Sequence, residues 1–188
     1  MYMKIYLGGV NAVGKTTVAK ETAKKLGISY IHATKGLMDH LGISNDYEKL
    51  RALTQEERDI ALGVYIENLL SLDDSFLLDG HYLGLVRGEV NRITGSWITG
   101  FDRLILVSAS TDDVWSRINN DERDRSLFPK NLSETEIKDM LKIYQYDTGN
   151  EFRRLGEIYD KKGFEVLNSE NNLDEAVKNL VEYIEKYK

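Results

Sequence analysis

The chain has 188 residues, which is enough for one well-packed domain and short for two. Its 41% hydrophobic and 30% charged residues are the proportions of an ordinary globular protein. The formal net charge of −6 excludes an overall basic field of the kind that attracts nucleic acid or anionic membranes. There are no cysteines, so disulfide bonds and thiolate zinc sites are excluded, and the composition fits a reducing compartment.

No apolar run approaches the ~20 residues that a membrane-spanning helix requires. The N-terminus leads directly into the first predicted strand, so we expect no signal peptide. No linker, repeat or low-complexity block divides the sequence. We therefore predict one cytoplasmic domain over residues 1–188, with neither nucleic acid nor a membrane as its partner.

The first predicted element is a buried strand over residues 3–7, and a helix is predicted over residues 17–26. Between them, residues 9–16 read GVNAVGKT, a full match to the pattern G-x-x-x-x-G-K-[ST]. Strand, glycine-containing loop and helix, in this order, form the context in which the pattern binds phosphate. The alternative is a plain glycine turn, but a chance match to the full pattern is rare in a chain of this length.

The residue types of this loop have physical roles. Backbone N–H groups of the loop point inward and the helix N-terminus adds partial positive charge, so together they attract an anion. We expect Lys15 to reach the β- and γ-phosphates and Thr16 to give its hydroxyl to Mg²⁺. The sequence thus predicts a site for a nucleoside triphosphate, formed by consecutive residues: Gly9, Val10, Asn11, Ala12, Val13, Gly14, Lys15, Thr16 and Thr17.

Strands and helices are predicted to alternate along the rest of the chain. Apolar runs predict strands over residues 28–32, 75–79, 103–107 and 164–168. Helices are predicted to follow capping boxes at Thr54/Glu57, reaching about residue 72, and at Ser133/Glu136, reaching towards residue 160, and to cover residues 112–121 and 173–187. Such alternation predicts an α/β fold with a parallel sheet between two helical layers. Ligands of these sheets bind outside the carboxyl ends of the strands.

A carboxylate ends one of the predicted strands. Asp79 is the last residue of the strand over residues 75–79, and Gly80 and His81 follow it. This carboxylate can hold the water shell of Mg²⁺ or orient the phosphoryl acceptor; the alternative is an aspartate that caps a helix. His81 either contacts a phosphate or a base, or hydrogen-bonds within its own loop.

Several arginines are candidates for offsetting phosphate charge. Arg123 and Arg125 follow the helix over residues 112–121 and are suited to closing over a migrating phosphoryl group. The alternative is a solvated surface segment in which neighbouring acids neutralise them. Arg51 and Arg87 lie in connections and suit fork-type binding of a monophosphate, although singly each also fits an ordinary surface position. One arginine of the pair 153–154 is a candidate to face the site while the other faces solvent.

Together these segments resemble the nucleoside-monophosphate kinases, most closely the archaeal-type adenylate kinases. The resemblance rests on MKIYLGGVNAVGKTTVAKETAKKLG, ISYIHATKGLMDHLGISNDYEKLRALT, FLLDGH and NNDERDRS. It implies a three-layer α/β/α P-loop fold with a five-stranded parallel sheet in the order 2-3-1-4-5, ATP as donor, Mg²⁺, and a monophosphate acceptor. It also implies a helical monophosphate-binding segment at about residues 33–72 and a short lid at about 119–132. Relatives of this type often form trimers, so a homo-oligomer is possible.

By the same resemblance, particular residues acquire roles. Lys15 and Thr16 take ATP and Mg²⁺, with Asp79 reaching the metal through water. Catalysis is assigned to Lys15, Asp79, Arg123 and Arg125, and acceptor binding to Arg51, Arg87, His81 and Asp79.

The sequence also departs from that family. Proline and glycine are common where this loop has Asn11 and Ala12, and a D-T-H triplet is common where this chain has D-G-H. The expected leucine-proline motif after His81 is missing, and so is an arginine near Gly149.

We therefore predict a kinase that moves the γ-phosphate of Mg·ATP to a nucleoside monophosphate, with AMP favoured. Two alternatives stay open. One is a P-loop kinase for another nucleotide, a nucleoside or a metabolite hydroxyl; the other is a non-catalytic ATP-binding regulatory module.

Overall fold

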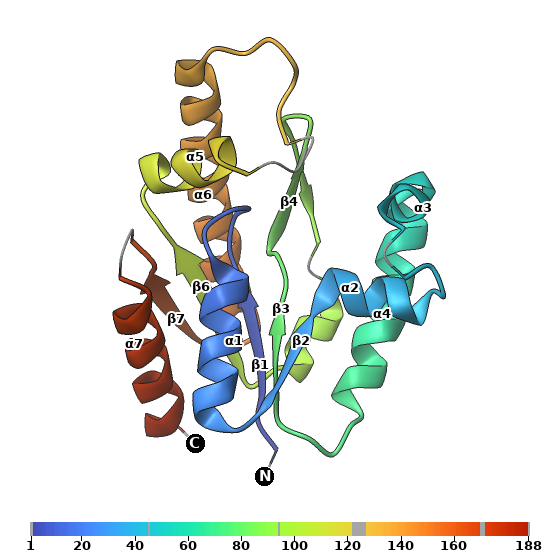
Figure 1. Cartoon of the computed structure of the whole chain (residues 1–188). Coiled ribbons are helices and arrows are strands. Elements are labelled where there is room, and N and C mark those ends of the chain that lie inside the picture. The colour runs from blue at the N-terminus through green and yellow to red at the C-terminus, as the bar shows by residue number, and fades with distance from the viewer. Residues whose placement is uncertain (1, 45, 94, 122–126, 170–171, 188) are drawn as a thin grey trace.

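A five-stranded parallel sheet forms the centre of the molecule (Figure 1). The computed structural model describes residues 2–44, 46–93, 95–121, 127–169 and 172–187. The strands lie in the order β2-β3-β1-β6-β7, and every neighbouring pair is parallel. Their bounds are β1 Lys4–Gly8, β2 Ser29–His32, β3 Phe76–Asp79, β6 Arg103–Ser108 and β7 Lys162–Leu167.

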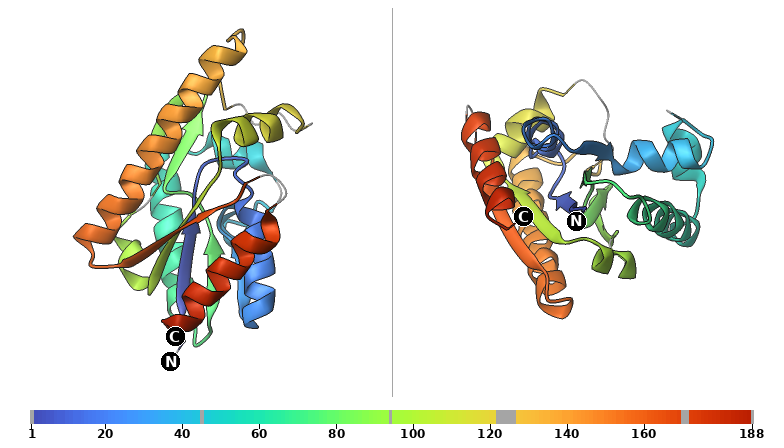
Figure 2. Two further views of the ribbon diagram at one scale, coloured as in Figure 1. Left: turned by 90° about the vertical axis from the view of Figure 1, so that its left-hand side faces the viewer. Right: turned by 90° about the horizontal axis from the view of Figure 1, so that it is seen from below.

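Helices cover both faces of this sheet (Figure 2). Helices α1 (Lys15–Leu26) and α7 (Leu173–Lys186) pack side by side on one face, while α6 (Glu134–Ile158) crosses the other face and contacts β6 and β7. Helix α5 (Thr111–Asn119) connects β6 to the segment that precedes α6. The predicted three-layer α/β/α architecture is confirmed.

The two faces of the sheet carry separate apolar clusters because side chains alternate along each strand. On β1, Ile5 and Leu7 join the cluster beneath α1 and α7, whereas Tyr6 joins the cluster on the other face. All three are at most 1% exposed. Burial on both faces is the reason that the parallel strands read as nearly continuous apolar runs.

The predicted strands and long helices are present with small shifts of their ends. Counting only the strands of the central sheet gives the predicted order 2-3-1-4-5; the labels differ because two further strands come between β3 and β6. These are β4 (Leu83–Val86) and β5 (Glu89–Arg92), which form an antiparallel hairpin that the sequence analysis did not predict.

Three helices flank the β2 edge of the sheet, at the right of Figure 1: α2 (Ala33–His40), α3 (Tyr47–Ala52) and the longer α4 (Gln55–Leu70). The 3₁₀ turn η1 (Ser96–Gly100) contacts α4. Both capping boxes are formed, at Thr54 before α4 and at Ser133 before α6. Within the described ranges, no helix is both long enough and apolar enough to cross a membrane.

Candidate nucleotide-binding site

The glycine-containing loop joins β1 to α1 at the carboxyl edge of the sheet. A Cβ atom on Gly9 would lie 2.3 Å from the carbonyl oxygen of Val107, so the backbone of β6 permits no side chain there. Gly14 has φ 89, and its Cβ would lie 2.2 Å from Nδ2 of Asn168. Both pattern glycines are therefore required by close contacts, and Gly14 also by its left-handed backbone.

Lys15 is the first residue of α1, and its side chain is only 7% exposed. Its ammonium group donates to the carbonyl oxygen of Val10 at 2.7 Å, which folds the side chain back across the loop. The N–H groups at the start of α1 face the same loop. A cation and a helix N-terminus thus converge on one concave backbone, which is the arrangement that binds a polyphosphate.

Asp79 lies beside Thr16 because β3 runs next to β1. Leu7 and Asp79 are register partners, so the carboxyl end of β3 reaches the beginning of the loop. Asp79 is 3% exposed, and its Oδ2 accepts a hydrogen bond from the Thr16 hydroxyl at 2.7 Å. Hydroxyl and carboxylate oxygens are the ligands that Mg²⁺ prefers, so this pair fits the predicted metal position.

Tyr30, which the sequence analysis did not single out, is the second hydroxyl at this carboxylate. Its phenol donates to Oδ2 of Asp79 at 3.2 Å from the neighbouring strand β2. Burial and the nearby Asp79 charge raise the pKa of Tyr30 well above its ordinary value. The phenol therefore stays protonated and remains a donor throughout the neutral pH range.

His81 connects the loop after β3 to the phosphate loop. Its Nδ1 lies 3.1 Å from the carbonyl oxygen of Gly9, and its own carbonyl accepts a hydrogen bond from the buried Tyr6 phenol at 2.7 Å. The sequence left open a contact with phosphate or base, or a hydrogen bond within His81's own loop; the structure instead has the ring bonded to a different loop, the phosphate loop. A contact with a substrate stays a prediction.

Two further side chains grip the phosphate loop from the β6–β7 side. Nδ2 of Asn168 donates to the carbonyl oxygen of Val13 at 2.8 Å, and Arg117 donates to the same oxygen at 3.0 Å. Arg117 also donates to the carbonyl oxygen of Asn168 at 3.1 Å. Neither residue is predicted as a site residue from the sequence. Asn168 could have been found by the rule that gave Asp79, because it is the last residue of the strand predicted over residues 164–168.

The predicted acceptor arginines occupy separate elements. Arg51 lies exposed on α3 and pairs with Glu48 at 2.8 Å. Arg87 lies exposed in the turn between β4 and β5, with φ 50. The structure therefore does not gather them at Asp79, and their joint role stays a prediction. Arg123 and Arg125 lie outside the described residues.

Neither arginine of the pair on α6 is directed to the phosphate loop by its hydrogen bonds. Arg154 forms a two-point pair with the buried Glu151, with both distances 2.7 Å. Arg153 donates to Asn150 at 2.8 Å and lines a separate hollow.

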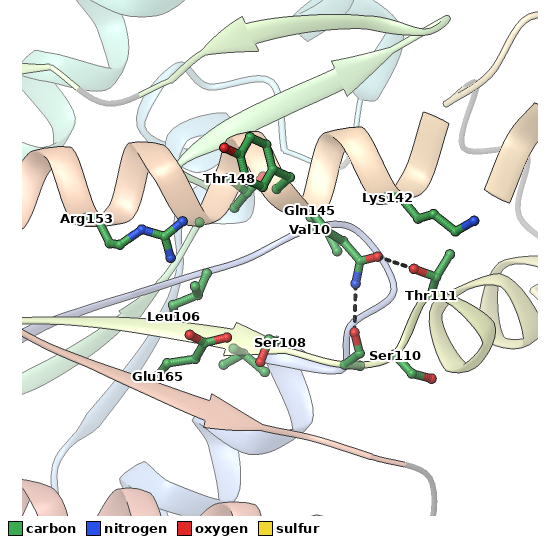
Figure 3. Close-up of a pocket in the computed structure, with 14 residues that line it drawn as sticks. Val10, Leu106, Ser108, Ser110, Thr111, Lys142, Gln145, Thr148, Arg153 and Glu165 are labelled. Carbon is green, nitrogen blue, oxygen red and sulfur yellow. Dashed lines mark hydrogen bonds between the residues drawn. The ribbon is translucent and has the colours of Figure 1, made fainter. Parts of the chain in front are cut away.

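That hollow, of about 490 Å³, lies between α6 and the carboxyl ends of β6 and β7 (Figure 3). It reaches the phosphate loop at Val10, while Arg153 and Glu165 line its far end. Gln145 of α6 joins two sides of the hollow: its amide N–H donates to the carbonyl oxygen of Ala109 at 2.7 Å, and its amide oxygen accepts from the Thr111 hydroxyl at 2.8 Å. Helix α6 is thereby fixed to the loop after β6.

A family model described as an AAA domain matches residues 8–155, and the chain therefore belongs to this AAA domain family. None of the curated proteins compared with the sequence matches it.

Solved structures resemble the whole chain. A shikimate kinase from Acinetobacter baumannii, in complex with shikimate, is 14% identical with a TM-score of 0.70, over 100% of this chain and 96% of that one. A shikimate kinase from Bacteroides thetaiotaomicron is 13% identical with a TM-score of 0.66, over 97% and 98%. One from Aquifex aeolicus is 17% identical with a TM-score of 0.62, over 98% of each chain.

At these identities the structural likeness shows the fold alone. Family and fold together make the chain an AAA domain protein with the three-layer P-loop fold. The narrower resemblance to adenylate kinases receives no support from these findings.

Proposed function

We propose that the protein transfers the γ-phosphate of Mg·ATP to a hydroxyl group of a small metabolite. The observation that carries this proposal is the buried carboxylate of Asp79, which lies one hydrogen bond from the Thr16 hydroxyl at the phosphate loop. A carboxylate in this position serves an acceptor that must lose a proton. The likeness to shikimate kinases adds a fold in which a small acceptor is phosphorylated.

The reaction then needs few protein groups. The acceptor oxygen attacks the γ-phosphorus, the bond to the β-phosphate oxygen breaks, and ADP leaves. The hydroxyl proton passes to Asp79, which Tyr30 and Thr16 hold in place through Oδ2. Lys15 and the loop amides take the charge of the phosphates. A magnesium ion would be held by Thr16 and, through water, by Asp79, and would neutralise the oxygens of the donor.

A nucleoside monophosphate is the second candidate acceptor. It is favoured by the sequence from residue 28 to 54, where Arg51 matches the arginine that binds the monophosphate in archaeal-type adenylate kinases. A phosphate acceptor is already ionised, so it needs alignment and cations rather than a base.

A panel of acceptors tests these proposals. ADP formation is followed with Mg·ATP and shikimate, other hydroxyl compounds of similar size, nucleosides, AMP and other monophosphates. We expect turnover with a hydroxyl compound and little ADP without an acceptor. Turnover with monophosphates alone would replace the first proposal by the second, and ATP binding without turnover of any acceptor would favour a regulatory module.

Asp79→Asn separates the two kinds of acceptor. With a hydroxyl acceptor, loss of the base should lower kcat by about 10² to 10⁴. With a monophosphate acceptor, the loss should be much smaller because no proton has to be removed. Lys15→Ala should abolish transfer with either acceptor. Lys15 is the only lysine of the loop over residues 9–16, so its removal takes away the ammonium group that offsets the phosphate charge. An Asp79→Asn enzyme with unchanged kcat on a hydroxyl acceptor would contradict the proposed base.

A further inference from the structure

The chain that follows β3 is tied to the phosphate loop at successive points. Asp79 accepts from Thr16 at 2.7 Å, and His81 lies 3.1 Å from the carbonyl oxygen of Gly9. A third tie involves Leu83, the first residue of the hairpin strand β4. Unlike the other two, this tie is made by a side chain of α6, the helix that covers the face of the sheet away from α1 and α7.

Tyr144 forms this third tie. Its phenol lies 2.9 Å from the carbonyl oxygen of Leu83 and 3.1 Å from Oδ1 of Asn11 in the phosphate loop. The residue is 1% exposed, and burial raises the pKa of its phenol well above the ordinary value. A phenol has one hydrogen and can accept as well as donate. Both partners are acceptors, so the single hydroxyl hydrogen is shared between the carbonyl oxygen of Leu83 and Oδ1 of Asn11, and one atom joins the hairpin to the loop.

The same helix holds the hairpin at a second point. Leu83 is the register partner of Arg92 on β5, and Arg92 pairs with Glu151 of α6 at 3.6 Å. Tyr144 and Glu151 lie about two helical turns apart on α6. Helix α6 therefore contacts both strands of the hairpin, at Leu83 of β4 and at its register partner Arg92 of β5.

The tip of the hairpin contacts Leu127, which belongs to the segment predicted to be the lid, at about residues 119–132. The N–H of Gly88 donates to the carbonyl oxygen of Leu127 at 2.8 Å. A Cβ on Gly88 would lie 2.7 Å from Met140 of α6, so the tip packs closely against the same helix. The hairpin therefore lies between the phosphate loop, α6 and the chain that follows α5.

We infer that Tyr144 is a positioning residue that transmits occupancy of the phosphate loop to the β4–β5 hairpin. Nucleotide bound in the loop fixes Asn11, Asn11 fixes the Tyr144 phenol, and the phenol fixes the backbone of Leu83 on the acceptor side. The inference rests on the proposed nucleotide site. It adds to that site a route by which the donor orders the surface that the acceptor meets.

Amide hydrogen exchange with Mg·ADP as the probe tests this route without any acceptor. In the parent protein, Mg·ADP should slow exchange in residues 9–14 and also in residues 83–92, the latter on the order of fivefold, the lower end of coupling between sites. Tyr144→Phe keeps the ring and removes the oxygen. We expect it to keep the protection of the loop and to reduce the protection of the hairpin to less than about twofold.

Two further variants make the test specific. Asn11→Ala removes the other end of the tie without altering the core, so it should uncouple the hairpin as Tyr144→Phe does, and the two changes together should add little. Tyr82→Phe is the matched control, because this fully buried phenol also donates to a carbonyl oxygen, that of Ile105 at 2.9 Å. The Tyr82→Phe variant should lose about as much thermal stability as Tyr144→Phe, but Mg·ADP should still slow amide exchange in its hairpin.

The outcomes separate this inference from the proposed function. If Tyr144→Phe keeps full protection of the hairpin, or if the parent shows protection of the loop alone, the positioning role is overturned while nucleotide binding stands. If Mg·ADP protects neither segment of the parent, the nucleotide site fails and this inference fails with it. Once an acceptor is known, Tyr144→Phe should lower kcat or raise the acceptor KM while leaving ATP affinity within about threefold.

Discussion

At Gly14 the backbone has φ 89 and an added Cβ would meet Asn168 at 2.2 Å, whereas at Gly27 the backbone has φ 65 with nothing within 4 Å. The two glycines thus separate backbone strain from steric overlap. Gly27→Ala should lower stability by about 1–2 kcal/mol, the cost of a left-handed alanine. Gly14→Ala should cost more and also weaken ATP binding at least about tenfold, because displacing Asn168 releases the carbonyl oxygen of Val13.

Chemical denaturation and ATP titration calorimetry measure the two effects. Equal stability and equal ATP affinity in the two variants would show that the contact with Asn168 contributes nothing to the loop.

Tyr30 offers a second prediction at this scale. Tyr30→Phe removes one of two hydroxyls that donate to Oδ2 of Asp79. A hydrogen bond to a charged group contributes about 1.5–3 kcal/mol, so we expect kcat to fall by roughly tenfold or more with little change in ATP affinity. Because the pKa of Tyr30 is raised, its proton is lost only at high pH, and the defect should be the same from pH 6 to pH 9. The exposed Tyr146 provides the control, since Tyr146→Phe should leave kcat unchanged.

The start of helix α6 is determined by a local sequence signal. Ser133 forms a capping box in which its side chain bonds the N–H of Glu136 and the Glu136 carboxylate bonds the N–H of Ser133. Ser133→Ala should lower the melting temperature by about 2–4 °C at pH 7. Hydrogen bonds from Ser133 lower the pKa of Glu136, so this contribution is present above the carboxyl's unfolded pKa and is lost as the pH falls through the lowered value.

The difference in melting temperature between parent and Ser133→Ala should therefore shrink as the pH falls below about 4.5, the ordinary glutamate value. Thermal scans between pH 7 and pH 3 measure it. A difference that grows towards low pH would contradict the assigned role of Glu136.

Local signals explain what the sequence could predict of these elements. Capping boxes, apolar runs and the glycine pattern are contiguous, so β1, α1, α4 and α6 could be located from residues alone. The β4–β5 hairpin was missed although its strands turn at Arg87 and Gly88, because each strand has only four residues and β5 is exposed throughout. The turn itself is marked in the sequence only by a glycine and the residue before it. Such a pair predicts a hairpin weakly when the strands on both sides are not clearly apolar.

The same distinction between local and distant signals holds for the residues of the candidate site. Lys15, Thr16 and Asp79 each belong to a local pattern or end a strand. Tyr30 and Tyr144 act through contacts with residues distant in sequence, and from the sequence alone each tyrosine is equally consistent with a place in the core. Only the register of the parallel strands and the path of α6 bring these side chains to the phosphate loop.

For the whole molecule, ligand binding must appear as stability, because a ligand that binds only the folded chain favours folding by mass action. Mg·ATP at a hundred times its Kd should add about 2.7 kcal/mol to the free energy of unfolding, which corresponds to roughly 5 to 10 °C in melting temperature. Chelation of magnesium should remove part of this shift, and Lys15→Ala should remove most of it. Thermal scans of parent and variant, with and without chelator, provide the measurement. A full shift that persists in Lys15→Ala would mean that ATP binds elsewhere, and the hollow beside α6 (Figure 3) would then be the next surface to test, through Arg153→Ala.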